Sequence, residues 1–250
     1  MIQSNGASQT RVSPASKSSK IRSLRRENQP LKASERTPAP TKRPLLRGAL
    51  HGIAFAVAVA VGVLLIVYSP ESRILPAGVF AASAAVMLGT SALYHRITWS
   101  RSARLWMRRA DHAGIFLLIA GTYTPVSLIS LNGAWRAIVL AISWSGAVAA
   151  AISKFCWVDA PKWLSALIAV TLGWLGVITL PQIVHHDGIA PVVLLAAGGI
   201  VYTTGAVVYA LRRPDPLPHV FGYHEVFHAL TICALACQYV AIAFFVVRVA

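Results

Sequence analysis

Two histidines four residues apart open the last apolar stretch of the chain, in the segment His224-Glu225-Val-Phe-His228. In a helix, residues four apart stand one above the other on the same face, so both imidazoles can bind one ion. His95, far earlier in the chain, ends another apolar stretch and supplies a third imidazole. Three neutral imidazoles leave a tetrahedral zinc ion with one open position for an activated water, as in catalytic zinc sites. The alternative is a pair of histidines that extend towards lipid headgroups.

Ser91 and Asp111 are the residues best suited to assist such a metal centre. Ser91 lies one helical turn before His95 on the same face, where its hydroxyl can hydrogen-bond a water on the metal. Asp111 opens a further apolar stretch, and its carboxylate can orient a ligand imidazole or that water. Plainer interpretations exist for both: the serine can bond a backbone carbonyl of its own helix, and the aspartate can pair with the nearby Arg109. We predict catalytic roles for Ser91 and Asp111.

The composition places these residues in a membrane protein. Of 250 residues, 56% are hydrophobic and only 12% are charged, and the charges gather near the N-terminus and in short connections. Further along the chain, apolar runs of roughly 20 residues follow one another, each long enough to cross a bilayer core of about 30 Å as a helix. No stretch of the sequence of comparable length has the composition of a soluble domain.

Seven apolar stretches predict an all-α fold, an integral membrane bundle of seven transmembrane helices. Helix breakers such as Pro70, Pro161 and Asn132 with Gly133 fall between the stretches. The predicted spans are about 49–68, 76–96, 110–130, 136–154, 163–181, 190–211 and 224–248. Together they define a domain over residues 48–250.

The distribution of basic residues predicts an N-terminus inside the cell and a C-terminus outside. In that orientation the loops on the inner side carry nine Lys and Arg residues, against three on the outer side. Cytoplasmic loops of membrane proteins show such an excess. His95, Asp111 and the His224 end of the last span then lie at one depth near the cytoplasmic face, as a single site requires.

Residues 1–47 are rich in Ser, Pro, Lys and Arg and nearly free of large apolar side chains, which predicts a disordered, basic cytoplasmic tail. Eleven of the 23 Lys and Arg residues lie there, beside the first span, where they favour anionic lipid headgroups as partners. The net charge of +15 is divided between this tail and the loops rather than gathered in a groove, so we exclude a nucleic-acid partner.

The order of the motifs resembles a known family. Ser91-Ala-Leu-Tyr-His95, then Asp111, then His224-Glu-Val-Phe-His228 fall on the predicted second, third and seventh helices, as in the PAQR and hemolysin III proteins, which include the adiponectin receptors. The likeness covers the predicted domain and leaves out the tail. It implies a seven-helix bundle in which the three histidines hold Zn2+, with the serine and the aspartate nearby. For a bacterial member it implies a multi-pass protein of the plasma (inner) membrane.

The same resemblance implies two classes of function. The wider superfamily is linked to ceramidase-like hydrolysis of lipid amides, so we predict a zinc-dependent hydrolase of membrane lipids or a membrane-homeostasis protein built on that chemistry. The alternative is a receptor-like or pore-forming, cytolytic protein in which zinc only ties helices together. A third interpretation comes from the residues alone: His224-Glu225-x-x-His228 matches the HExxH pattern of zinc proteases, although no acidic third ligand follows in a later span.

The remaining histidines receive plainer assignments. His51 and His112 are expected at the membrane interface. His185 and His186, with Asp187, fall on the opposite side in the predicted topology and are expected in a solvated loop.

Overall fold

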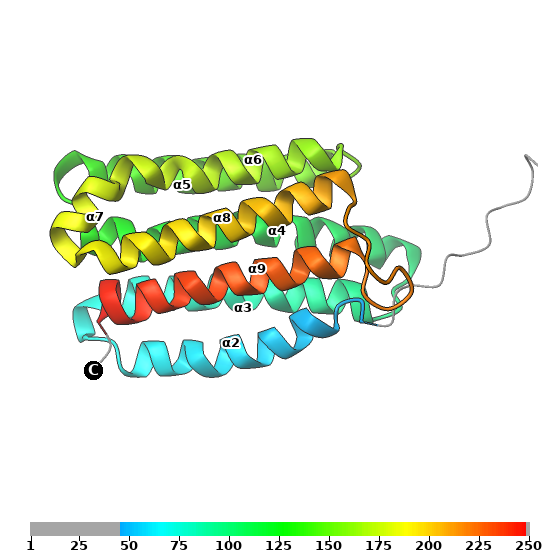
Figure 1. Ribbon diagram of the computed structural model, residues 1–250, viewed down its shortest axis with the longest axis horizontal. Coiled ribbons are helices and arrows are strands. Elements are labelled where there is room, and N and C mark those ends of the chain that lie inside the picture. Colours follow the sequence, from blue (N-terminus) through cyan, green and yellow to red (C-terminus); the bar gives the residue numbers. More distant parts are fainter. Residues whose placement is uncertain (1–45, 249–250) are drawn as a thin grey trace, which may run out of the picture. The chain divides into compact units, whose positions relative to one another are not determined.

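The computed structural model describes residues 46–248, which form a bundle of long helices (Figure 1). Seven helical segments in this range are long and apolar enough to cross a membrane, which confirms the predicted seven-helix bundle. The α-helices are α2 (Ala49–Val67), α3 (Ile74–Arg96), α4 (Arg101–Pro125), α5 (Gly133–Cys156), α6 (Lys162–Trp174), α7 (Leu180–Asp187), α8 (Ile189–Leu211) and α9 (Tyr223–Val240). The predicted tail, except for its last two residues, lies outside the described residues, and the orientation in the membrane stays a prediction.

Four of the spans change their helix type along their length, and the second does so at its start, where the 3-10 helix Glu71–Arg73 precedes α3. α4 continues as a π-helix over Val126–Ser130, and α9 continues as one over Ala241–Val247. α6 and α7 are joined by the 3-10 helix Leu175–Thr179 and together form the fifth span. Pro125 ends α4 and has no backbone N–H to donate, which favours the change of helix type at that point.

α4 begins at Arg101, well before the apolar stretch at 110–130 that marks it in the sequence. Ser100 caps the helix, because its hydroxyl accepts a hydrogen bond from the Ala103 N–H at 3.3 Å. The first turns carry several arginines, which hydropathy alone does not identify as part of a span. The helix therefore extends beyond the apolar region and holds basic residues at one end of the bundle.

The helices that carry the site residues pack closely. α3 lies between α2 and α4, and α8 packs against α9. A Cβ atom on Gly114 of α4 would lie 3.1 Å from the Met87 Cα of α3, so the small residue permits a close approach of the two helices. One core cluster joins α2, α3, α4 and the last span through Leu65, Phe80, Met87, Leu88, Leu118, Leu235 and Ile242. This packing fixes the ends of these helices relative to one another.

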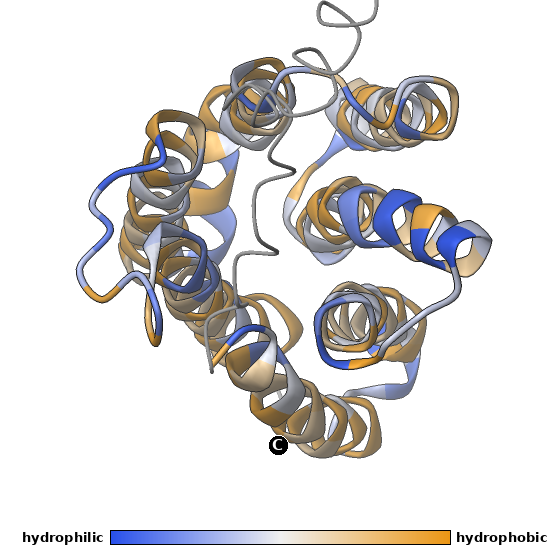
Figure 2. Cartoon of the chain, turned by 90° about the vertical axis from the view of Figure 1, so that its right-hand side faces the viewer, coloured by the Kyte–Doolittle hydropathy of each residue, from blue (hydrophilic) through white to orange (hydrophobic). Residues whose placement is uncertain are grey.

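The outer faces of the helices are apolar. Large hydrophobic side chains stay exposed along the spans, among them Ile53, Leu64, Ile138, Leu167 and Ile200. Seen along the bundle, hydrophobic residues cover most of the helices, and hydrophilic residues gather at helix ends and in loops (Figure 2). A continuous exposed apolar surface is what contact with lipid requires.

Successive spans run in opposite directions (Figure 1). The end of α3 and the beginnings of α2, α4 and α9 therefore lie at the same end of the bundle, on the right in Figure 1. We call it the histidine end, because it carries His95, His224 and His228. The opposite end, where α7 meets α8 and the last span finishes, is called the far end.

Candidate metal centre

Three histidines from two helices meet at the histidine end. His95 lies in the last turn of α3, and His224 and His228 lie one turn apart at the start of α9. The Nε2 atoms of His95 and His224 are 3.1 Å apart, and one ligand atom from each histidine lies within 4.8 Å of the others. Only 8% of the His95 side chain is exposed, and His228 is 2% exposed. The structure thus brings together the three residues that the sequence proposes as ligands.

The arrangement fits a metal ion. Imidazole nitrogens bind zinc at about 2.0–2.1 Å, so ligand atoms this close need only small side-chain adjustments to share one ion. The Nδ1 atom of His228 is buried and has no hydrogen-bond partner among the described residues, which is costly unless another group satisfies it. A donor set of imidazoles suits a transition metal or zinc and disfavours calcium and magnesium. The three histidines therefore form a buried group that can hold a metal ion.

Gly48, just before α2, leaves space for the side chain of His95. Its backbone is left-handed, with φ 77°, a conformation that glycine adopts at little cost. A Cβ atom at this position would lie 2.6 Å from the Cβ of His95, which is too close for any side chain. The chain can therefore enter α2 directly beside the metal ligand only because residue 48 has no side chain.

Ser91 and Asp111 lie beside this group. Ser91 is 2% exposed, one turn before His95, and its side chain hydrogen-bonds Asp111. The Asp111 Oδ2 atom is 3.8 Å from the His95 Nε2 atom, close enough for attraction but longer than a direct hydrogen bond. The alternative partner for this carboxylate, Arg109, forms no ion pair with it in the described structure. The aspartate is thus directed towards the histidines rather than towards the arginines of its own helix.

His51 is a member of the site that the sequence analysis missed, because the prediction of an interfacial position is wrong. It is 3% exposed and its ring stacks on that of His228, with centroids 3.8 Å apart and an angle of 11° between the planes. The available signal was its place in the first turn of α2, at the same end as the other histidines. His112 also faces inward: it lines the cavity described below, and its Nδ1 atom is buried without a partner among the described residues.

Glu225, the acidic residue of the HExxH pattern, is engaged elsewhere. Its side chain is buried, and its Oε1 atom accepts a hydrogen bond from the Arg47 Nε–H at 2.8 Å. Its Oε2 atom accepts another from the Gly222 N–H at 2.9 Å, which caps the start of α9. Because both carboxylate oxygens are occupied, the geometry favours a structural role for Glu225 over that of a general base.

A cavity of about 60 Å³ lies against the histidines. One water needs about 10–15 Å³ on this measure, so the cavity has room for several waters or for the polar end of a ligand. Its polar lining consists of His51, Ser91, Asp111, His112, Lys154, Ser165, Tyr202, Tyr209, His224, His228 and Thr231. We call it the histidine cavity.

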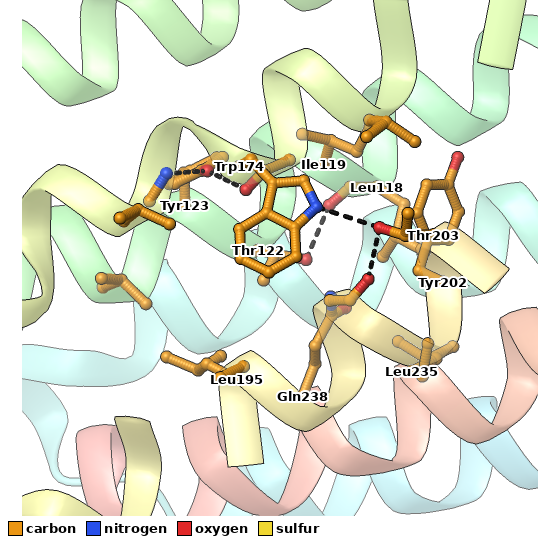
Figure 3. A pocket seen from close by; sticks show the side chains of 18 of the residues that line it. Leu118, Ile119, Thr122, Tyr123, Trp174, Leu195, Tyr202, Thr203, Leu235 and Gln238 are labelled. Carbon is orange, nitrogen blue, oxygen red and sulfur yellow. Dashed lines mark hydrogen bonds between the residues drawn. The ribbon is translucent and has the colours of Figure 1, made fainter. Parts of the chain in front are cut away.

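A second cavity, of about 140 Å³, lies next to the first in the interior of the bundle. Met87, Ile115, Tyr202 and Thr231 line both, so the two spaces share a boundary. Its walls are mostly aliphatic and aromatic side chains from α4, the fifth span, α8 and α9 (Figure 3). We call it the apolar chamber.

Several polar groups in the chamber wall are already bonded within the protein. The Tyr123 hydroxyl donates to the Gly173 carbonyl at 2.6 Å and accepts from the Gly176 N–H at 2.6 Å. The Trp174 Nε1–H donates to the Thr203 hydroxyl at 2.9 Å (Figure 3). The chamber therefore offers mainly apolar surface to an occupant.

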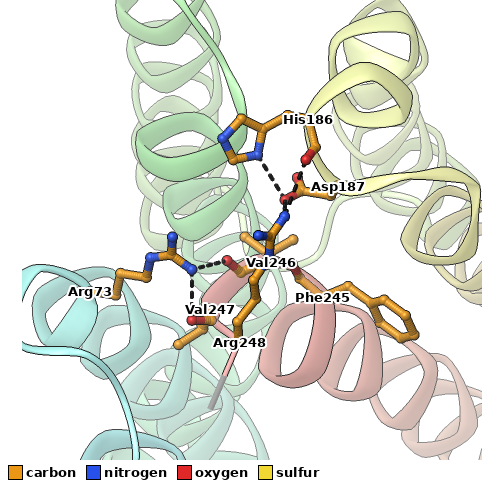
Figure 4. Close-up of polar contacts among 7 residues, drawn as sticks. All are labelled: Arg73, His186, Asp187, Phe245, Val246, Val247 and Arg248. Carbon is orange, nitrogen blue, oxygen red and sulfur yellow. Dashed lines mark hydrogen bonds and ion pairs between the residues drawn. The ribbon is translucent and has the colours of Figure 1, made fainter. Parts of the chain in front are cut away.

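The second polar cluster lies at the far end, and the prediction of a solvated loop is wrong for Asp187. This residue ends α7, and its side chain is fully buried. Its Oδ1 atom lies 2.8 Å from the His186 Nδ1 atom and 3.4 Å from an Arg248 Nη atom (Figure 4). The cluster is too far along the bundle to join the histidines, as the sequence analysis expects.

An arginine from the start of the second span completes the far end. Arg73 donates hydrogen bonds to the carbonyl oxygens of Val246 and Val247, at 3.1 and 2.9 Å (Figure 4). These carbonyls belong to the last turn of the final helix and have no partner further along it. The contact ties the second span to the end of the seventh.

Comparison with known proteins identifies relatives along most of the chain. A family model described as "Haemolysin-III related" matches residues 40–239. The chain is 28% identical over 212 residues to "Hemolysin-3 homolog" of Bacillus subtilis (strain 168), which covers 83% of this chain and 96% of that protein. It is 28% identical over 213 residues to "Hemolysin-3" of Bacillus cereus, which covers 84% of this chain and 94% of that protein. The resemblance inferred from the motifs is confirmed.

Proposed function

The chain is a multi-pass membrane protein that belongs to the Haemolysin-III related family, and from this premise we propose that it is a zinc-dependent hydrolase of lipid amides. The observation that carries the proposal is the pair of adjacent cavities, one lined by histidines and the other apolar. A lipid amide has the same two parts, a polar amide and a hydrocarbon chain. Since the two relatives come from Bacillus species, we place the protein in a bacterial plasma membrane.

His95, His224 and His228 would hold the zinc ion. When bound, zinc polarises a carbonyl group and supplies an activated water. An all-imidazole set of three ligands is the type found in catalytic zinc sites, where one position stays open to water or substrate. His224 and His228 line the histidine cavity, and the low exposure of His95 and His228 would shield the reacting groups from bulk solvent.

Asp111 would transfer the proton, and Ser91 would hold the Asp111 carboxylate in position. In amide hydrolysis a C–O bond forms between water and the carbonyl carbon, the C–N bond breaks, and one proton passes from the water to the leaving amine. The Asp111 carboxylate lies at the cavity wall and can accept that proton and return it to the amine. Ser91 hydrogen-bonds the carboxylate and so fixes its direction. The fatty chain of the product would remain in the apolar chamber.

The test is the release of fatty acid from a lipid amide by purified, zinc-loaded protein, measured by mass spectrometry. We expect turnover by the wild type, none by His228→Ala, and recovery of wild-type turnover when zinc is returned after chelation. Asp111→Asn should keep the metal but lose roughly 10²–10⁴-fold in rate, the usual contribution of a general acid–base group. Turnover that persists in zinc-stripped His228→Ala protein would refute the proposal.

A second candidate function follows from the printed names of the relatives, which describe hemolysins. In that case zinc would only join α3 to α9, and expression would make membranes permeable. This candidate predicts that chelation lowers the melting temperature while intact protein hydrolyses no lipid. Leakage of a dye from vesicles that contain the protein separates the two functions, because the hydrolase predicts no leakage in the absence of an amide substrate.

A further inference from the structure

Lys154 is a buried cation without an acidic partner among the described residues. It lies near the end of α5, is 2% exposed, and lines the histidine cavity. Its ammonium group donates a hydrogen bond to the Ser165 hydroxyl of α6, and none of the described carboxylates lies within ion-pair distance of it. A lysine within a membrane span is costly and normally pairs with an acid or faces a functional cavity. For Lys154 the described residues offer no acid, so the remaining alternative is the histidine cavity that it lines.

The groups around Lys154 make this wall of the cavity positive. His112 lines the same cavity and stands in the electrostatic field of Arg108, Lys154 and Lys162. Among the described residues, the acid that acts on His112 from this side is Asp159, which is bound to Arg108 at 2.6 Å in an exposed pair. The wall therefore carries an excess of positive charge.

Asp111, which lines the same cavity, belongs to another wall. It lies one residue before His112 on α4, about 100° away around the helix, and its partners are Ser91 and His95 of α3. The cavity is thus divided between a wall with the proposed proton carrier and a wall with an unpaired lysine. An anion that lies between α4, α5 and α6 would contact the positive wall and leave the histidines accessible.

We propose that Lys154, Ser165 and His112 form a subsite for a phosphate group at the polar end of the lipid. Lysine binds phosphate as a point charge, and the serine hydroxyl and the unpartnered His112 Nδ1 can add hydrogen bonds. This inference rests on the proposed function, because it defines the substrate class as lipid amides with a phosphate headgroup. Free inorganic phosphate has the same chemistry, so the test distinguishes the two sources.

The binding experiment uses full-length, zinc-loaded protein in detergent. The probes are a short-chain ceramide phosphate, the matching neutral ceramide and inorganic phosphate, and the readout is the shift in melting temperature. We expect the ceramide phosphate to stabilise the wild type more than the neutral ceramide does. Lys154→Gln should abolish that difference, while Arg101→Gln, which removes an exposed positive charge from the same end, should preserve it.

Three results would overturn the proposal. Equal shifts for the two lipids in the wild type would show that the phosphate is not recognised. A difference that persists in Lys154→Gln would show that this lysine does not recognise it. A shift with inorganic phosphate alone, as large as with the lipid and dependent on Lys154, would assign the site to free phosphate instead of a headgroup.

A second variant keeps the test valid if Lys154→Gln does not fold. Ser165→Asp places a carboxylate beside the Lys154 ammonium, so the lysine is paired and the subsite is filled from within. We expect this variant to retain its metal. Its melting temperature should no longer respond to ceramide phosphate more strongly than to neutral ceramide. A full response in Ser165→Asp would overturn the subsite.

Turnover separates this inference from the proposed function. In Lys154→Gln the KM for the phosphate lipid should rise roughly 10- to 100-fold, as expected for a lost charge-assisted hydrogen bond, with little change in kcat or in turnover of the neutral lipid. An unchanged KM would count against the subsite. No hydrolysis of either lipid would refute the hydrolase, while the difference in melting temperature would still test the phosphate site.

Discussion

The two ends of the bundle bury polar residues in opposite ways. At the far end, Asp187 pairs with His186 and Arg248, and Arg73 donates to the last carbonyls of the final helix. These groups pair mainly with one another, although the Asp187 Oδ2 atom is buried without a hydrogen-bond partner among the described residues. At the histidine end, three imidazoles converge, and Lys154 faces a cavity without an acidic partner among the described residues.

This difference separates contacts that hold helices together from groups available to a ligand. Buried polar groups that pair with one another contribute to stability and leave no capacity for a further partner. Groups that converge on a cavity cost stability until something binds them. Substitutions at the far end should therefore change stability and leave metal content intact, whereas those at the histidine end should change what the protein binds.

Loss of a metal ligand should separate the two ends most strongly. We expect about one zinc per chain in the wild type, as for a single three-histidine site, and none in His95→Ala or in the His224→Ala, His228→Ala double variant. Asp187→Asn, at the far end, should keep the full metal content. Metal content is measured by mass spectrometry on protein purified in detergent without any chelator. If zinc remained in His95→Ala, α3 would not be part of the metal site, and the contrast between the two ends of the bundle would fail.

The Arg47–Glu225 pair lies at the histidine end, but like the contacts of the far end it is satisfied within the protein. Arg47→Met would leave the Glu225 carboxylate buried with only the Gly222 N–H as partner. We expect a loss of about 3 kcal/mol in the free energy of unfolding, the lower limit for breaking a buried pair, because the arginine side chain is 26% exposed. The double variant Arg47→Met, Glu225→Gln should recover part of that loss. Chemical unfolding in detergent micelles measures both, and a single variant as stable as wild type would contradict the structural role.

The same comparison shows what the sequence could predict. The seven spans follow from apolar runs and the breakers between them, and the three histidines follow from spacing and shared depth, because these signals are local or repeat along the chain. The stacking of His51 on His228 and the pairing of Glu225 with Arg47 join α2, or the residues before it, to α9, and hydropathy carries no information on such contacts. The start of α4 was missed because its basic first turns are not apolar.

Gly48 allows the positioning of His95 to be tested apart from ligand chemistry. Gly48→Ala should cost about 1–2 kcal/mol, the usual penalty for a side chain in the left-handed conformation, and should also weaken zinc binding because the new Cβ would displace His95. Gly133→Ala is the matched control: its φ is also positive, at 57°, and a Cβ there meets nothing within 4 Å. Both variants should lose stability, but only Gly48→Ala should bind zinc more weakly in a competition titration. Equal zinc affinities would mean that His95 can shift without cost.

The smallest expected effect is at the far end, where Arg73→Gln removes the donors to Val246 and Val247. We expect a loss of about 1 kcal/mol in the free energy of unfolding, typical of a hydrogen bond that is not deeply buried. Arg136→Gln is the control, since within the described residues that arginine donates only to the Leu131 carbonyl, five residues away in the sequence. Zinc content and lipid turnover should be unchanged in both, because the contact lies at the end of the bundle opposite the histidines. If Arg73→Gln instead reduced zinc content or turnover as well as stability, the two ends would be coupled through α3, the helix that begins beside Arg73 and ends at His95. The far end would then take part in positioning the site, and its polar contacts would no longer be separable from function.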